Sequence, residues 1–250
     1  SKRHELTSNG KESKTWYHRS DRAGEDVKLK DNRIDSCDHL GPKNRGTLAR
    51  FTGTIWILEQ RYSRFYRWCK RGVWEKIFLE LSKDQDHEEY MIDGRKPLFT
   101  SMAPVEKGAQ KQGIGRSRGG NTTKIHAVAD ALGNPILIYL TGGQVSDLTP
   151  AIDLMNLFDL ENSYVLADKG YDSKEFVEAI EAKGGIPVIP SRKNAKQPRS
   201  YDQYVYQDRR LIENCFLLLK NFCRIATRYE KTLISYLGMI HLACILIWLR

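Results

Sequence analysis

Hydrophobic residues first take up a regular spacing at Ile55. From there on, aromatic and aliphatic side chains recur every three or four positions, which predicts a helical segment over residues 55–87. Gly72 interrupts the spacing and predicts a break between two helices. Cations lie between the aromatic residues, so the pair either contacts nucleic acid or is an ordinary amphipathic support. They are Arg61, Arg64, Arg67, Lys70 and Arg71.

Residues 1–54 show neither a helical nor a strand period. Their few large apolar side chains bury too little surface to offset the conformational entropy that folding removes. We therefore expect this N-terminal region to be disordered or loosely held. The alternative is a basic arm that contacts DNA without sequence preference.

Strand patterns begin after this helical segment. Glu88–Asp93 reads as a short strand, and residues 94–120 read as a long basic loop. The clearest hairpin follows, in which Lys124–Ala129 turns through residues 132–134 into Ile136–Leu140.

Two further strands and two helices continue the pattern. The strands are predicted at Tyr164–Ala167 and Ile186–Ile189, and the helices at Thr149–Phe158 and Ser173–Lys183. We therefore assign residues 88–250 to an α/β domain with a mixed sheet flanked by helices.

The last segment, Leu233–Leu249, is almost wholly apolar. It is shorter than an ordinary membrane span, and buried core helices of this length are common. We expect it to pack across the sheet rather than to enter a membrane. His241 is then a hydrogen-bonded core residue and not a metal ligand.

The chain of 250 residues carries a formal charge of +9, which favours a polyanionic partner such as nucleic acid. Its 5 cysteines are scattered, without the spacing of a zinc site, and are read as reduced thiols. No signal peptide is recognised at the start. Neither a phosphate-binding G-x4-G-K-[ST] loop nor a G-x-G-x-x-G dinucleotide motif occurs.

The segment from Tyr206 to Lys220 has the spacing Y-x2-R-x3-E-x6-K. On a helix, this spacing places Tyr206, Arg209, Glu213 and Lys220 on roughly one face. One carboxylate between cations suits a surface that holds a metal through Glu213 and phosphates through its neighbours. The alternative is a solvated helix face with weak ion pairs.

Two aspartates follow predicted buried strands, Asp93 after the first and Asp168 after Tyr164–Ala167. Sites in α/β proteins collect at the carboxyl ends of strands, so both could converge with Glu213 on two divalent cations. Taken singly, each is an ordinary turn or cap residue. Asp147 or Ser146 is expected to cap a helix in that way.

Several cations lie in acid-poor loops and are candidates for phosphate contacts. Arg116, Arg118 and Lys124 belong to or follow the long basic loop. Arg192 and Lys193 lie before Tyr201. The alternative is that these loops are only solvated surface.

Four segments in this order resemble the insertion-sequence DDE transposases, of the group typified by insertion sequence five. They are YMID with Asp93, QGIGRSRGGNTTKIHAVADALGNP, LADKGYD with Asp168, and the spacing from Tyr206 to Lys220. The resemblance covers residues from about 62 to 93 and 109 to 250.

This resemblance implies a ribonuclease-H-like fold in which Asp93, Asp168 and Glu213 bind two Mg²⁺ or Mn²⁺ ions. It implies metal-dependent cleavage of double-stranded DNA at transposon ends and strand transfer to a target, by a homo-oligomer on the DNA. Arg209 and Lys220 then position phosphates, and Tyr206 orients DNA or its own helix. We expect a cytoplasmic, nucleoid-associated bacterial protein. The alternatives are a catalytically inactive remnant that binds DNA, and a nuclease without strand transfer.

The resemblance is interrupted twice, at residues 8–54 and 94–109. In the family, Ser-Thr normally follows the first catalytic aspartate, whereas here Asp93 is followed by GRKPLFTSMAPVEKGAQ. Our hypothesis is that both windows are translated out of the ancestral reading frame. Translation of the gene in its other two frames tests it, and finding no family-like sequence there would refute it.

Overall fold

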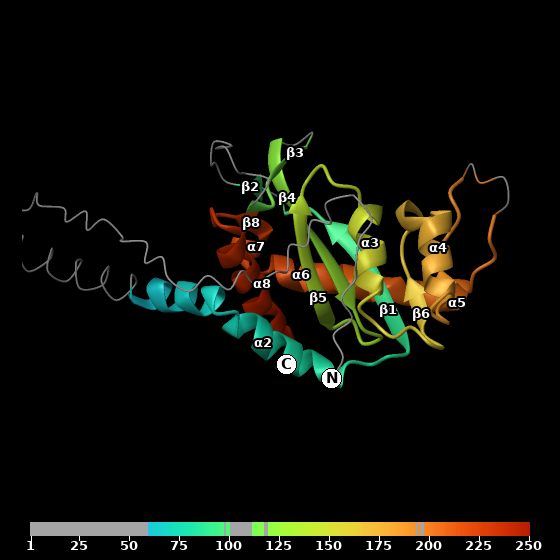
Figure 1. The fold of residues 1–250 in the computed structure, drawn as a ribbon, viewed down its shortest axis with the longest axis horizontal. Coiled ribbons are helices and arrows are strands. Elements are labelled where there is room, and N and C mark those ends of the chain that lie inside the picture. Colours follow the sequence, from blue (N-terminus) through green and yellow to red (C-terminus); the bar gives the residue numbers. More distant parts are fainter. Residues whose placement is uncertain (1–59, 98, 101–111, 118–119, 194, 196–197) are drawn as a thin grey trace, which may run out of the picture. The chain divides into compact units, whose positions relative to one another are not determined.

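The computed structural model describes residues 60–97, 99–100, 112–117, 120–193, 195 and 198–250 (Figure 1). The chain divides into two units, 1–53 and 54–250, and every described residue belongs to the second. The predictions for residues 1–54 and for Arg118 lie outside the described residues.

A mixed sheet in the order β5-β4-β1-β6-β7 forms the centre of this unit, and β3 pairs with the start of β4. β4 pairs antiparallel with both β5 and β1, whereas β6 pairs parallel with both β1 and β7. This mixed sheet, with helices beside it, confirms the predicted α/β class. The strands are β1 (Glu89–Arg95), β3 (Gly115–Ser117), β4 (Gly120–Ala129), β5 (Pro135–Gly142), β6 (Tyr164–Leu166) and β7 (Ile186–Val188).

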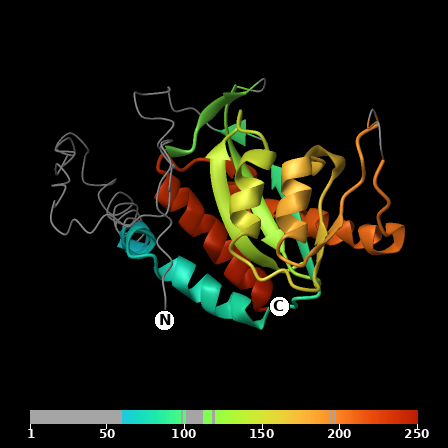
Figure 2. The same cartoon turned by 45° about the vertical axis from the view of Figure 1, so that its right-hand side comes forward.

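The two faces of the sheet bury separate apolar clusters, because successive side chains of a strand point to opposite faces. Met91 packs in one cluster with Ile212, and Ile92 packs in the other with Leu154. Figure 2 shows α8 on one side of the sheet and α3 with α4 on the other. The helices are α3 (Leu148–Met155), α4 (Lys174–Glu181), α6 (Arg210–Lys220) and α8 (Leu233–Trp248).

The predicted C-terminal helix is α8, which packs on the sheet and on α2 (Val73–Leu81) as expected for a core helix. His241 is buried in it and stacks on Phe78, with ring centroids 5.3 Å apart. The predicted break between the two earlier helices is confirmed at Gly72, whose φ of 63° favours glycine. Among the described helices, none has the length and apolarity needed to cross a membrane.

The segment predicted as a loop, residues 94–120, in fact contains strands. β1 continues to Arg95, because Gly94 and Arg95 pair with His126 and Ile125 of β4. A two-residue strand, β2 (Phe99–Thr100), pairs with β8 (Thr227–Arg228). These ladders are made by distant backbone groups, so the local sequence pattern did not reveal them.

The segment predicted as one helix from Tyr206 to Lys220 is instead three consecutive helical pieces. They are α5 (Gln203–Tyr206), the 3₁₀ turn Gln207–Arg209, and α6. Asp202 begins the first piece, because its carboxylate accepts hydrogen bonds from the N–H groups of Tyr204 and Val205. The backbone stays helical through Arg209, at φ −52° and ψ −23°, so the side chains along this surface remain neighbours.

Candidate active site

The parallel pairing of β1 with β6 brings two aspartates to one edge of the sheet. Met91 pairs with Leu166, and Asp93 and Asp168 each follow two residues later. Because side chains alternate, Asp93 points to the same face as Met91, which is the face that α6 covers. The register therefore aligns the two predicted carboxylates at the carboxyl ends of neighbouring parallel strands.

Asp168 also caps the 3₁₀ turn that follows it, Lys169–Tyr171. Its Oδ1 accepts a hydrogen bond of 2.7 Å from the N–H of Gly170. A Cβ at position 170 would lie 2.7 Å from the same oxygen, which leaves no room for a larger residue. The cap role and the ligand role weighed for Asp168 are thus compatible, since the turn fixes the carboxylate where the strand ends.

Glu213 lies in the first turn of α6, and α6 contacts β1. Arg209, one turn earlier, forms an ion pair with its Oε1. The guanidinium carbon of Arg209 lies 5.9 Å from the centre of the Tyr206 ring. Three of the four residues of the predicted spacing are therefore in contact, whereas Lys220 ends α6 two turns beyond Glu213.

Asp93 is 6% exposed, and its carboxylate has a close counter-ion. Its Oδ2 accepts a hydrogen bond of 2.9 Å from Arg95 Nε, and its Oδ1 accepts one of 2.8 Å from the N–H of Gly94. Burial raises the pKa of Asp93 above its ordinary value, although Arg95, Gly94 and Arg209 all favour the charged form. Arg95 also contacts Glu213, with 3.4 Å between Arg95 Nη2 and Glu213 Oε1.

A second polar cluster lies on the other face of the sheet, beside Gly94. A Cβ at position 94 would lie 2.1 Å from Asp147 Oδ1 and 3.0 Å from His126 Nδ1. Lys124 Nζ lies 3.1 Å from Asp147 Oδ1, and His126 Nδ1 lies 3.7 Å from it. Burial lowers the pKa of His126 to about 3, so its ring is neutral and Lys124 is the cation of this cluster.

The Tyr171 hydroxyl links the two clusters electrostatically. It is buried without a hydrogen-bond partner among the described residues. Burial raises the pKa of Tyr171 first, and the charges of Asp147, Asp93 and Asp168 raise it further. The hydroxyl therefore lies in the field of three carboxylates, which keeps it protonated.

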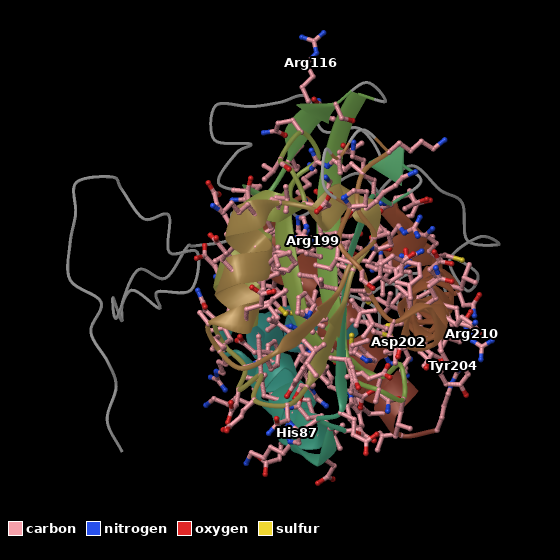
Figure 3. All side chains as sticks on the ribbon, turned by 90° about the vertical axis from the view of Figure 1, so that its right-hand side faces the viewer. His87, Arg116, Arg199, Asp202, Tyr204 and Arg210 are labelled. Carbon is pink, nitrogen blue, oxygen red and sulfur yellow. The ribbon has the colours of Figure 1, made fainter. Side chains whose placement is uncertain are left out.

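The predicted phosphate-binding cations are found in different surroundings. Lys124 is buried, and its ammonium group donates a hydrogen bond to the Val145 carbonyl. Arg192 and Lys193 are exposed in the loop beyond β7, and Arg192 donates to the carbonyl of Gly170, two residues past Asp168. Arg116 is exposed on β3, and Figure 3 shows it pointing away from the other described elements.

Three residues near the carboxylates were not predicted to belong to the site. Arg95 was counted only as part of a basic loop, although it lies two residues after Asp93 and so shares its face once the strand is extended. Asp147 was expected to cap α3; it does precede the helix, but its side chain makes no cap hydrogen bond. Tyr171 gives no sequence signal beyond its place in the LADKGYD segment.

The donor types suit divalent cations, because Mg²⁺ and Mn²⁺ prefer carboxylate oxygens. The arrangement is closed, however, since Arg95 lies between Asp93 and Glu213. Among the described residues, no three acidic, histidine or cysteine side chains are grouped closely enough to hold an ion. In the described residues, these carboxylates are therefore not grouped as a metal site, and Asp93 and Glu213 are paired with Arg95 instead.

Known proteins resemble this chain over the same region. A family model described as a transposase DDE domain matches residues 92–249. A protein of Brucella ovis, named as a transposase for insertion sequence element IS6501, is 40% identical over 134 residues, 52% of this chain and 99% of that protein. One of Burkholderia cepacia, named for element IS402, is 30% identical over 142 residues, 53% of this chain and 64% of that protein.

The solved structures that match this chain are more distant. The piggyBac transposase in its synaptic complex with hairpin DNA has a TM-score of 0.46 and 13% identity, over 70% of this chain and 49% of that one. The Mos1 transposase in a paired-end complex with the left transposon end has a TM-score of 0.27 and 13% identity, over 74% and 62%. The family of this chain is therefore assigned from the family model and the sequence relatives, and not from these structures.

Proposed function

Because this chain belongs to the family of transposases with a DDE domain, we propose that it cleaves DNA at the ends of an insertion sequence and transfers the cut strand to a target. The observation that carries the proposal is the register of β1 with β6. It aligns Asp93 with Asp168 at one edge of the sheet, on the side where α6 presents Glu213.

In this proposal Asp93, Asp168 and Glu213 hold two Mg²⁺ or Mn²⁺ ions once Arg95 has moved. When bound, such ions activate a water or a 3′-hydroxyl and stabilise the leaving oxygen of a phosphodiester. Other residues of the chain hold these carboxylates in position. The Gly170 N–H fixes the Asp168 carboxylate, and Arg209 orients that of Glu213.

Double-stranded DNA is the proposed substrate, and exposed cations near the site support it. Arg192 is held beside Asp168 through the Gly170 carbonyl, and Lys193 follows it in the same loop. Arg116 is exposed on β3 and Lys220 is half-buried at the end of α6, and in this proposal both make further phosphate contacts. Lys124 is left out of this set, because it is buried against Asp147.

We expect a homo-oligomer on the DNA, since joining two ends of one element requires two active sites held together. The overall charge of +9 makes assembly without DNA unfavourable and assembly on a polyanion favourable. Light scattering with and without an end-bearing DNA duplex measures this directly.

A second candidate function is DNA binding without cleavage. The observation that favours it is the Arg95 guanidinium between Asp93 and Glu213, which neutralises the carboxylates that a metal needs. A chain in which Arg95 never leaves binds DNA through its exposed cations and cuts nothing.

Nicking of a plasmid that carries the element's own ends, with Mn²⁺, separates the two functions. The native chain is compared with Glu213→Gln, which keeps the side-chain size but loses the charge. Glu178→Gln, on the solvated side of α4, is the matched control. Nicking by native and Glu178→Gln but not by Glu213→Gln supports the proposal. Retarded DNA with no nicking by any of the three supports the binding function instead.

A further inference from the structure

An unbroken chain of ion pairs joins the two sides of the active site. Arg95 Nε lies 2.9 Å from Asp93 Oδ2, and Arg95 Nη2 lies 3.4 Å from Glu213 Oε1. Glu213 Oε1 is also paired with Arg209. One guanidinium thus bridges a carboxylate of the sheet and a carboxylate of the covering helix, as a metal ion does in a carboxylate site.

The strand itself places Arg95 there. Because β1 runs on to Arg95, which pairs with Ile125, the alternation of side chains puts residues 93 and 95 on the same face. A guanidinium presents five N–H donors in a rigid fork, so it can donate along two edges to two carboxylates. An uncharged side chain at this position could not satisfy both carboxylates in this way.

The charges in this cluster already balance. Asp93 and Glu213 carry two negative charges, and Arg95 and Arg209 carry two positive ones. A divalent cation entering the cluster is repelled by both guanidinium groups unless one withdraws. Arg95 is the one free to do so, because its side chain is 44% exposed, whereas that of Arg209 is 18% exposed and also contacts Tyr206.

We propose that Arg95 is a built-in competitor for metal: its guanidinium occupies the space between Asp93 and Glu213, and a divalent cation binds only when it swings out to solvent. This inference rests on the proposed function, since it concerns the same carboxylates. In this chain Arg95 is the second residue after Asp93, on the same strand. The competition is therefore specific to chains that carry an arginine here.

Calorimetric titration of the full chain with Mn²⁺, without DNA, measures the competition directly. Arg95→Gln keeps a long polar side chain but removes the charge, and we expect it to bind Mn²⁺ at least about tenfold more tightly, equivalent to about 1.4 kcal/mol. Arg95→Lys keeps the charge but loses the fork, and we expect an affinity between the two. Arg210→Gln is the control, because this exposed residue loses the same charge beside Arg209 and joins none of the ion pairs described (Figure 3).

A second readout covers the case in which Arg95→Gln folds poorly. Without metal, Arg95→Gln should melt at a lower temperature than the native chain, because buried Asp93 loses its counter-ion, and Arg95→Lys should melt between the two. Saturating Mn²⁺ should raise the melting temperature of the variants more than that of the native chain, by mass action. Asp168→Asn is measured beside them and should weaken Mn²⁺ binding in either background.

Each outcome decides something. Tighter binding by Arg95→Gln, with Arg210→Gln within about twofold of native, supports the competition, because a general charge effect would move both. Equal affinity of native, Arg95→Gln and Arg95→Lys overturns it while leaving the metal site intact. Absence of Mn²⁺ binding in all variants overturns both this inference and the metal-dependent function.

Discussion

Asp93 and Asp168 stand at equivalent positions of two neighbouring parallel strands, each two residues beyond the pair formed by Met91 and Leu166. The pairing of backbones, rather than contact between the side chains, brings them to one edge. A substitution that preserves the strand should therefore leave their alignment intact while changing only the chemistry of the site.

Asp168→Asn tests that separation. The amide keeps an oxygen that can accept from the Gly170 N–H, so the free energy of unfolding should change by less than about 1 kcal/mol. Nicking with Mn²⁺ should fall at least about 100-fold, because a neutral amide is a poor ligand for hard cations. Asp159→Asn, which removes a carboxylate on the surface, is the control for both measurements. Retained nicking by Asp168→Asn would exclude this residue as a ligand.

Gly94→Ala should destabilise the fold through the cluster behind the active site. The new methyl group would meet Asp147 Oδ1 at 2.1 Å, and Asp147 is held by Lys124. We expect a loss of about 1–3 kcal/mol in urea unfolding, the usual cost of overpacking. The double variant Gly94→Ala with Asp147→Ser should lose less than the sum of the single changes. Strict additivity would contradict the contact.

Among the described residues, Arg228 is the largest fully buried side chain, and it joins three segments of the chain. It donates to the carbonyls of Gln112 and Glu230 and to the hydroxyl of Thr123. Arg228→Lys cannot make all three bonds, and we expect a loss of about 3 kcal/mol or more. Arg224→Lys, at a half-exposed arginine that pairs with Glu230, should cost under about 1 kcal/mol. If chemical denaturation showed equal losses of unfolding free energy for the two variants, the prediction that Arg228 is the more important residue would be wrong.

Substitution of the exposed cations should weaken DNA binding, whereas substitution of the buried cation Lys124 should lower stability. Arg192→Gln and Lys193→Gln should each reduce affinity and lower the slope of log K against log salt by about 1, as expected for a lost phosphate contact. Lys124→Gln should instead lower the melting temperature, because Asp147 loses its partner. Gel retardation at several salt concentrations, with melting curves, distinguishes the two effects. A salt slope altered by Lys124→Gln in a folded chain would reverse this assignment.

Acid should destabilise the fold partly through His241. Burial lowers its pKa to about 4, whereas an unfolded histidine titrates near 6.5. The folded chain thus keeps the ring neutral. The stabilisation is complete above about pH 6.5 and is lost as the pH falls toward 4, at up to about 1.4 kcal/mol per unit. His241→Phe can still stack on Phe78. It should reduce the slope of the unfolding free energy against pH by the equivalent of about one proton. An unchanged slope in urea unfolding would contradict the prediction.

Much of the sheet and the carboxylate set could be predicted from local signals. The alternation in the hairpin after Lys124 and the short apolar run at Tyr164 each define a strand, and a strand determines where the next aspartate points. The positions of α3, α4 and α8 likewise follow from the spacing of their apolar residues, and their ends differ by only a few residues.

What the sequence could not show depends on partners far away in the chain. Gly94 and Arg95 look like the start of a loop, and only the hydrogen bonds to β4 make them strand. The same two residues determine how the site is closed, since Arg95 lies against Asp93 and Gly94 lies against Asp147. Likewise, Lys124 reads as an exposed cation until β5 and the turn after it cover its ammonium group.

The atypical stretch after Asp93 is joined to the domain at β1 and at β2, and both ladders use only peptide N–H and C=O groups. Such pairing accepts almost any sequence without proline. The fold can therefore tolerate the substitution of many residues in this stretch, whereas the catalytic centre cannot. A transposase copy can thus keep its fold when the residues around its carboxylates change, so an intact fold does not by itself show that the copy cleaves DNA.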